Sequence, residues 1–477
     1  MQFATLEFLC FFVPVLGLSW ALRPYPMGRK LFLLVASYWF YAQWDLRLLG
    51  LIIGTSVINF VCGELIATSG AASTRRAALN TSLLANLGML GFYKYYGFFR
   101  DNVEALANVA GVSSGLPVLE VLLPLGISYI TFQCMTYTID LHRGYGTRAR
   151  SLTDFLLYIA FFPQVLIGPI CRSRDLLDQL HAPAPRGIPD LSRAVSLIFS
   201  GLFKKVILAT YLATHLVEDA FNGPESFSSL ELLVAAYAYT IQIYCDFSGY
   251  TDMALGIGLL MGFHLPDNFN QPYRATNIAE FWRRWHMTFS NWLRDYVFLP
   301  MGGSWGPWWK TYFNLMVVMW VTGIWHGAAW KFMLWGSVHG VALVAYKLVQ
   351  DRRKAKGINP RELVHPWWYH VVCWLYTFHL VVLARIFFRS TDLEVGFTYW
   401  AVLLEGSVWG RGIEWLVIPV ALVGLGLNFW GQHIRRAFIA MHEATPMMWR
   451  PMLWAALGMG IIALQPADVA PYIYFAF

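Results

Sequence analysis

The sequence predicts an all-α, polytopic integral membrane protein. Of its 477 residues, 57% are hydrophobic and 17% are aromatic, whereas only 13% are charged; ordinary soluble domains carry roughly 25% charged residues. Apolar runs of about the length needed to cross ~30 Å of hydrocarbon recur from one end of the chain to the other. We therefore expect a single membrane-embedded domain over residues 1–477, with no large soluble domain.

The apolar segments are the candidate membrane crossings. Several are too short or too interrupted to cross alone, so we expect roughly ten to thirteen crossings, with the other segments re-entrant or interfacial. No basic region precedes the first segment and no small-residue cleavage site follows it, which predicts a retained helix and not a signal peptide. The segments are 5–22, 31–44, 48–67, 79–99, 118–138, 154–170, 197–217, 230–245, 253–265, 312–325, 328–349, 368–388, 396–409, 413–430 and 452–464.

Positive charge is concentrated in short connections between these segments. The net charge is +7, and the densest basic loops are 351–362 and 68–78. This distribution is the positive-inside bias of membrane proteins, so we expect both loops to be cytoplasmic. We expect the chain to be embedded in a lipid bilayer and to have no nucleic-acid partner. The six cysteines are isolated and lack the spacing of a metal site or a disulfide framework, and we expect no bound metal.

The longest region that is not simply hydrophobic is 266–311, and it contains NIAEFWRRWHMTFSNWLRDYVF over 277–298. Aromatic residues at 3-4-3-4 spacing predict one amphipathic helix that lies in the membrane interface, with Asn277 as N-cap and Glu280 at the capping-box position. A surface helix with no further role is an equally good interpretation. The aromatic stripe comprises Trp282, Trp285, Phe289, Trp292 and Tyr296, and the polar side comprises Arg283, His286, Ser290 and Arg294.

Two carboxylates, Asp246 and Asp252, lie close together at the end of an apolar segment, in YCDFSGYTD. A carboxylate at membrane depth is costly unless it is paired, so we expect both to have partners. One interpretation is that they hold a helix break together by hydrogen bonding, and the other is a role in function.

The stretch GIWHGAAWKFMLWGSVHG, residues 323–340, contains two histidines. His326 ends an uncharged run, and an ionisable side chain at membrane depth is a functional-site hypothesis; a neutral imidazole can act there as a general base. The alternative is a satisfied core histidine. His339 would lie about 140° around and ~20 Å along an uninterrupted helix, so the two could act together only if the helix breaks at the glycines. Otherwise His339 supports helix packing.

No protein nucleophile is evident, because the chain has no G-x-S-x-G elbow, P-loop or dinucleotide fingerprint. A single histidine base would therefore need a substrate hydroxyl as the nucleophile and an activated donor as the electrophile.

Three motifs in order resemble the membrane-bound O-acyltransferase family, in its bacterial alginate O-acetyltransferase-like branch. They are YCDFSGYTDMALGIGLLMGF, NFNQPYRATNIAEFWRRWHMTFSNWLRDY and GIWHGAAWKFMLWGSVHG, and the two chain ends, FLCFFVPVLGLSWAL and PYIYFAF, are also similar. The resemblance implies helices around a central funnel, with a catalytic core of about 230–345. It also implies that His326 and His286 are the two catalytic residues.

The resemblance implies acyl transfer, with acetyl groups passing to hydroxyls of an exported polysaccharide such as alginate or a cellulose-like polymer. The donor would be acetyl-CoA or an acyl carrier with no bound cofactor, periplasmic acetylation proteins would be partners, and the chain would lie in the bacterial inner membrane. D-alanyl transfer to a cell-wall polymer and a proton-coupled transporter stay open as alternatives. The expected supporting residues are Arg283, Ser290, Arg294, Asp246, Asp252, Trp325 and His339.

Overall fold

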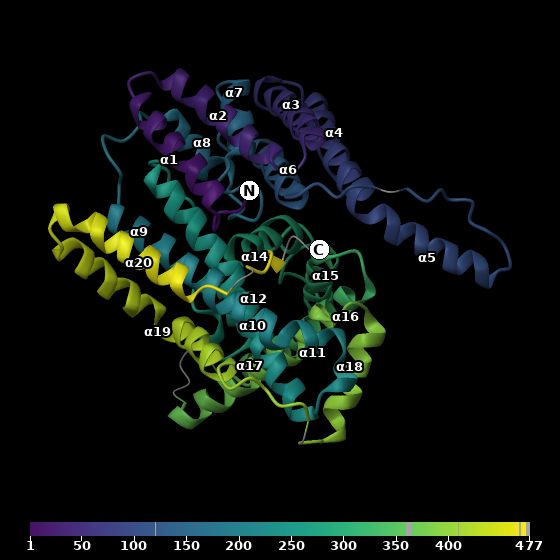
Figure 1. Ribbon diagram of the computed structural model, residues 1–477. Helices are drawn as coiled ribbons and strands as arrows, with labels where there is room; N and C mark the ends of the chain where they lie inside the picture. Colours follow the sequence, from purple (N-terminus) through teal and green to yellow (C-terminus); the bar gives the residue numbers. More distant parts are fainter. Residues whose placement is uncertain (120, 359–364, 409, 467–468, 474–477) are drawn as a thin grey trace. The chain divides into compact units, whose positions relative to one another are not determined.

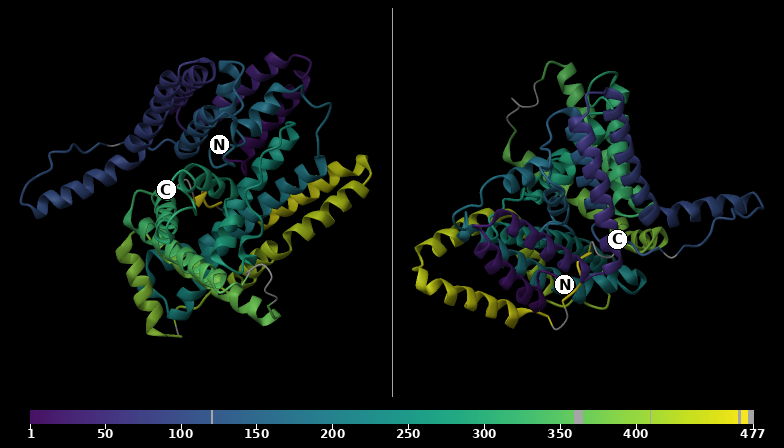
Figure 2. Two further views of the ribbon diagram at one scale, coloured as in Figure 1. Left: turned by 180° about the vertical axis from the view of Figure 1, so that it is seen from behind. Right: turned by 90° about the horizontal axis from the view of Figure 1, so that it is seen from above.

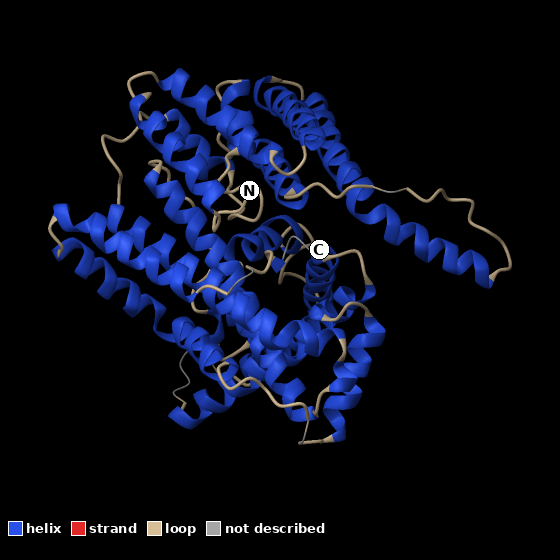
Figure 3. Cartoon of the chain, in the orientation of Figure 1, coloured by secondary structure: helices blue, strands red, loops and turns tan. Residues whose placement is uncertain are grey.

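The described chain is made of helices, turns and loops, and the all-α prediction is confirmed. A computed structural model describes residues 1–119, 121–358, 365–408, 410–466 and 469–473 (Figure 1), and no strand occurs within these ranges (Figure 3). The end of the basic loop 351–362 and the last four residues of PYIYFAF lie outside the described residues. The chain divides into two compact units, Met1–Ile198 with Tyr250–Pro266 and Phe199–Gly249 with Asp267–Phe477.

The first unit contains a bundle in which α3, α4 and α6 pack against one another. Helix α7 packs on α2 and α3, and Figure 2 shows the α3 and α4 pair from two further directions. Helix α5 follows α4 through a π-helical segment, Gly91–Tyr95, and extends away from the other helices of this unit (Figure 1). The helices are α1 Leu6–Ala21, α2 Pro26–Ala42, α3 Leu46–Thr68, α4 Ala72–Leu90, α5 Tyr96–Val109, α6 Ile127–Arg143, α7 Leu152–Ala160, α8 Ser173–His181 and α9 Leu191–Leu202, which continues into the second unit.

The second unit is centred on a hairpin of α15 and α16, with α17 and α13 packed on α16. Helix α12 is shared, because its residues up to Gly249 belong to this unit and its end belongs to the first. The helices are α10 Thr210–Leu212, α11 Glu218–Asn222, α12 Ser229–Leu260, α13 Ile278–Arg284, α14 Met287–Leu293, α15 Trp308–His326, α16 Trp330–Ala355, α17 Trp367–Arg389, α18 Leu393–Glu405, α19 Val417–Ala444 and α20 Arg450–Leu464.

Six helical segments of the described chain are long and apolar enough to cross a membrane, and α1 is a shorter apolar helix. The protein is therefore a multi-pass membrane protein. Length and composition alone select fewer helices than the roughly ten to thirteen crossings expected. The predicted segment 154–170, for example, holds only part of the nine-residue helix α7, followed by turns. The six are Leu46–Thr68, Leu191–Asn222, Trp330–Ala355, Trp367–Arg389, Val417–Ala444 and Met447–Leu464.

The predicted helix break around Asp246 does not occur. Segments 230–245 and 253–265 were expected as separate spans, but α12 runs without interruption from the first into the second and ends at Leu260. The Asp246 carboxylate is neutralised inside the helix bundle by an ion pair with Lys205, and the backbone N–H of Ile473 donates to it over 2.8 Å. A paired carboxylate can stay within a helix at membrane depth, because the desolvation cost is offset by its partners.

The α15 and α16 hairpin is built on glycines that let the two backbones approach closely. A methyl group on Gly323 would lie 2.3 Å from the carbonyl oxygen of Phe332, and one on Gly336 would lie 2.4 Å from that of Met319. Neither distance is possible for a real side chain, so only glycine permits this packing. Gly323 thus lets the backbone of α16 approach α15 closely.

Candidate active site

The helix that would carry both histidines is broken between them. Helix α15 ends at His326 and α16 begins at Trp330, and the intervening residues Gly327 and Ala329 are extended. The chain reverses direction there, which brings His339 on α16 back toward His326. The predicted separation of about 140° and ~20 Å assumed an uninterrupted helix and is therefore wrong. The helix breaks at the glycines, which was the condition under which the two histidines could act together.

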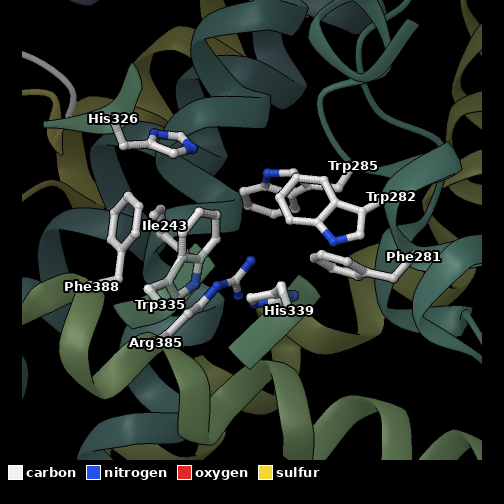
Figure 4. A pocket seen from close by; sticks show the side chains of 9 residues that line it. All are labelled: Ile243, Phe281, Trp282, Trp285, His326, Trp335, His339, Arg385 and Phe388. Carbon is white, nitrogen blue, oxygen red and sulfur yellow. The ribbon is translucent and has the colours of Figure 1, made fainter. Parts of the chain in front are cut away.

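His326 and His339 line one small pocket in the second unit (Figure 4). The free space in the pocket is about 10 Å³, which is roughly room for one water molecule. Its walls come from α12, α13, α15, α16 and α17 and from the residue that follows α13, so segments far apart in the sequence meet here. The lining residues are Ile243, Phe281, Trp282, Trp285, His326, Trp335, His339, Arg385 and Phe388.

Aromatic rings hold the two histidines in place. The ring of His326 lies 5.2 Å from that of Trp335 and 5.0 Å from that of Phe388, measured between centroids. Trp335 also contacts His339, at 4.8 Å. The Trp335 indole thus touches both imidazoles, and both are almost fully buried, with exposed fractions of 4% for His326 and 1% for His339.

Several polar atoms of the pocket residues have no hydrogen-bond partner within the described part of the chain. They are both ring nitrogens of His339 and the indole N–H groups of Trp282 and Trp335. Buried polar groups in folded proteins are nearly always paired, and the exceptions call for an explanation such as a bound ligand or water. A pocket whose walls carry unsatisfied donors and acceptors is suited to binding a polar group.

Arg385 is the one cationic residue among those that line the pocket, and it was not named from the sequence. Its guanidinium carbon lies 4.5 Å from the centroid of the Trp285 ring, and its Nη1 donates to the Tyr273 hydroxyl over 2.5 Å and to the Thr240 carbonyl over 3.4 Å. A signal was available, because Arg385 lies inside the predicted span 368–388. The rule that singled out His326, an ionisable group at membrane depth, applies to it equally.

His286 lies at a break in the predicted amphipathic helix. Helix α13 ends at Arg284 and α14 begins at Met287, with His286 in the left-handed region (φ 43°, ψ 58°). This conformation is strained for a residue with a side chain, and such strain clusters at functional sites. The prediction of one continuous helix over 277–298 is wrong, although Asn277 is the N-cap as expected, accepting from the Glu280 N–H over 2.8 Å. The Glu280 carboxylate accepts from Thr276 and not from Asn277.

The His286 side chain is fully buried beside the pocket without lining it. Its Nδ1 lies 3.0 Å from Asn268 Oδ1, which also accepts from the N–H and hydroxyl of Thr288; Nδ1 is therefore the donor, and Nε2 is left unprotonated. Burial lowers the pKa of His286 to about 3. The rings of Phe289 and Trp325 contact both His286 and His326, so the two histidines share neighbours while only His326 reaches the pocket.

The expected polar stripe is not gathered around His286, because the break turns its members in different directions. Arg283 is exposed, the Ser290 hydroxyl donates to the Trp285 carbonyl over 3.1 Å, and Arg294 pairs with Asp295 at 2.7 Å. None of the three lines the pocket.

The other expected supporting residues also lie outside the pocket lining. Trp325 is buried and stacks on Phe289, with centroids 4.2 Å apart. Asp246 has the expected partner, Lys205, on the helical segment before α12. Asp252 is buried in the first unit, whereas the pocket belongs to the second. Of the seven residues expected to support the site, the structure brings His339 to the pocket.

Comparison with known proteins finds a family model that matches the part of the chain containing the pocket. The family model described as "MBOAT, membrane-bound O-acyltransferase family" matches residues 125–389, a range that contains every residue of the pocket. The same range also contains His286, Asn268 and Tyr273.

Three curated relatives cover nearly the whole chain. A probable alginate O-acetylase of Azotobacter vinelandii is 36% identical over 86% of this chain and 79% of its own length. One from Pseudomonas putida is 33% identical over the full length of both chains. A peptidoglycan O-acetyltransferase of Helicobacter pylori is 35% identical over 87% of this chain and 81% of its own.

Proposed function

Because the chain belongs to the membrane-bound O-acyltransferase family, we propose that it transfers acetyl groups to hydroxyls of an exported polysaccharide, with His326 as general base. The observation that carries this proposal is a buried imidazole at the end of α15 that lines a pocket otherwise walled by aromatic rings, one isoleucine, one more histidine and one arginine. Relatives named as O-acetylases of alginate and of peptidoglycan support an acetyl donor and a polysaccharide acceptor.

The chemistry follows from the surroundings of His326. An alcohol is a very weak acid, so it attacks an acyl carbonyl only if a base removes its proton as the bond forms. A buried imidazole can accept that proton, and the bulky aromatic walls leave little room for the bulk water that would otherwise compete as a nucleophile. We assign His286 a positioning role. The hydrogen bond between its Nδ1 and Asn268 holds the backbone break beside the pocket, and Phe289 and Trp325 contact both His286 and His326.

The size of the pocket favours a short acyl group. About 10 Å³ of free space beside His326 has room for a carbonyl oxygen or a water molecule, and the indole of Trp335 and the ring of Phe388 close its side. A long acyl chain would have to displace these rings much further than an acetyl group would, because the free space holds about one water-sized group. The donor would be acetyl-CoA or an acyl carrier, and the protein itself would hold no cofactor.

The cellular setting follows from the same reaction. A multi-pass acyltransferase in a bacterial inner membrane would take its donor from the cytoplasm and deliver the acyl group toward an acceptor on the outer side. Periplasmic acetylation proteins are the expected partners, as the resemblance to this family implies. Alginate and cellulose-like polymers are both candidate acceptors, and the alginate-modifying relatives favour the first.

The test is acyl transfer in membranes that contain the full-length chain. His326→Ala should lower transfer of labelled acetyl from a thioester to an acceptor oligosaccharide by about 10² to 10⁴-fold, the usual contribution of a general base, while the protein accumulates normally. His379→Ala is the matched control, because His379 is an exposed histidine on α17 outside the pocket. Transfer at the wild-type rate by His326→Ala would refute the assignment of the base.

Mass spectrometry of the product separates the alternatives. Ester-linked acetate on the polymer supports the proposal, and ester-linked D-alanine would replace it with D-alanyl transfer. Proton-driven movement of a solute by reconstituted protein, without any acyl product, would replace it with a transporter.

A further inference from the structure

A buried cation without a carboxylate partner forms part of the pocket wall. Arg385 is 4% exposed, and none of its contacts within the described residues is with an acidic side chain. No aspartate or glutamate lines the pocket either. A charge in a low-dielectric region is expensive to keep without a counter-charge, so an uncompensated arginine beside a candidate base needs a reason.

The contacts of Arg385 fix its position without using up its donors. The guanidinium lies over the Trp285 ring and also near the rings of Tyr273 and Phe281, and stacking of this kind holds a planar cation in one orientation. Both of its hydrogen bonds come from Nη1. Nε and Nη2 make no hydrogen bond to the described residues, and Figure 4 shows the guanidinium reaching into the space that the nine side chains enclose.

We infer that Arg385 is a catalytic residue that stabilises the negative charge formed during acyl transfer. This inference rests on the proposed function. When the acceptor oxygen attacks the acyl carbon of a thioester, a new C–O bond forms, the hydroxyl proton passes to His326, and the carbonyl electron pair moves onto oxygen. Arg385 donates a hydrogen bond to that oxyanion. Collapse of the intermediate breaks the C–S bond, and the thiolate takes the proton from His326, so that an ester and a thiol result.

The geometry favours a carbonyl oxygen over a carboxylate of the acceptor as the partner of Arg385. The free space of about 10 Å³ matches one oxygen atom, whereas a sugar carboxylate would have to carry its ring into the same space. A preorganised donor aimed at the place where charge develops costs no reorganisation during the reaction, and in a water-poor site it acts more strongly than in solution. Arg385 is already held by Trp285 and Tyr273 before substrate binds.

The test separates the loss of transition-state stabilisation from the loss of binding or folding. Arg385→Gln should lower kcat by about 10² to 10³-fold, the effect of removing one oxyanion donor, with the KM values for thioester and acceptor little changed. Arg385→Lys keeps the charge and the long stem but loses the planar fork, so it should fold normally and still have a reduced kcat. Arg411→Gln is the matched control, because Arg411 stacks on Phe227 outside the pocket.

Chemical rescue gives a readout that a structural role alone would not produce. Arg385→Ala should regain part of its activity when guanidinium ions are added at concentrations that do not unfold the control variant. Two acceptors are compared throughout, an oligomer of uronic acid and an oligomer of glucose, so that a contact with the acceptor carboxylate can be recognised.

The possible results distinguish a failure of the Arg385 assignment from a failure of the proposed function. If Arg385→Lys keeps the wild-type kcat, or if only the KM for the uronic acid oligomer rises, the assignment of Arg385 is overturned while the proposed function stands. If the wild-type protein forms no ester at all, the proposed function fails first. A fall in kcat with both acceptors, partly restored by guanidinium, supports the assignment.

Discussion

The buried ion pair of Lys205 and Asp246 allows a quantitative prediction about stability. Both side chains are almost completely enclosed, with exposed fractions of 1% and 2%. The Lys205 ammonium also lies 4.0 Å from the centroid of the Tyr472 ring, and Asp246 accepts the Ile473 N–H. The pair therefore ties α12 to the helical segment before it and to the end of the described chain.

Removing one partner should be much more costly than removing both. Asp246→Ala leaves an unpaired ammonium in a low-dielectric interior, which should lower the free energy of unfolding by about 3–5 kcal/mol. The double variant Lys205→Met with Asp246→Leu removes both charges and leaves only the Ile473 N–H without its acceptor. Such a donor costs about 1–3 kcal/mol, so the double variant should be more stable than Asp246→Ala.

The measurement is a double-mutant cycle in detergent micelles. Unfolding of purified wild-type protein, the two single variants and the double variant is followed against increasing sodium dodecyl sulfate, and the coupling energy is taken from the four midpoints. The reasoning is refuted if Asp246→Ala costs less than ~1 kcal/mol, or if the double variant is no more stable than the single variants.

Three further predictions follow from the hairpin, the pocket wall and the buried histidine. Gly336→Ala puts a methyl group 2.4 Å from the Met319 carbonyl oxygen and should cost about 1–3 kcal/mol in the same titration, whereas Gly460→Ala, with nothing near it, should cost nothing. Trp335→Ala opens the wall beside the proposed base and should raise kcat/KM for propionyl relative to acetyl donors by roughly tenfold; an unchanged ratio would contradict the pocket as the acyl site. Since burial lowers the pKa of His286 to about 3, the unfolded chain takes up a proton below pH ~6.5 that the folded chain does not. Stability from this group is therefore full above that pH and falls by ~1.4 kcal/mol on going from pH 8 to pH 5.5, a loss that His286→Gln should remove.

Local patterns in the sequence predicted much of the fold because they depend on neighbours in the chain. Composition and apolar runs indicate a helical membrane protein, since any spanning segment must satisfy its own backbone hydrogen bonds. The cap at Asn277 is a contact over three residues, and the isolated ionisable group at His326 is visible from its apolar flanks. Family motifs in order were enough to identify the acyltransferase family.

Patterns failed where long-range packing overrides helical periodicity. The regular spacing over 277–298 predicts one helix, yet the chain breaks at His286, whose Nδ1 is hydrogen-bonded to Asn268 in the preceding loop, outside the helical segment. The YCDFSGYTD stretch suggests a broken helix, yet α12 is continuous, because Lys205, forty-one residues earlier, neutralises Asp246.

The composition of the pocket depends on tertiary contacts. His339 reaches the pocket because α15 and α16 turn back on each other at Gly327 and pack through glycines, and Arg385 reaches it because α17 lies against α16. Helical spacing describes only which side chains share a face of one helix. Which faces meet depends on close packing between segments that are distant in sequence, and here that packing sets two histidines and an arginine around one small cavity.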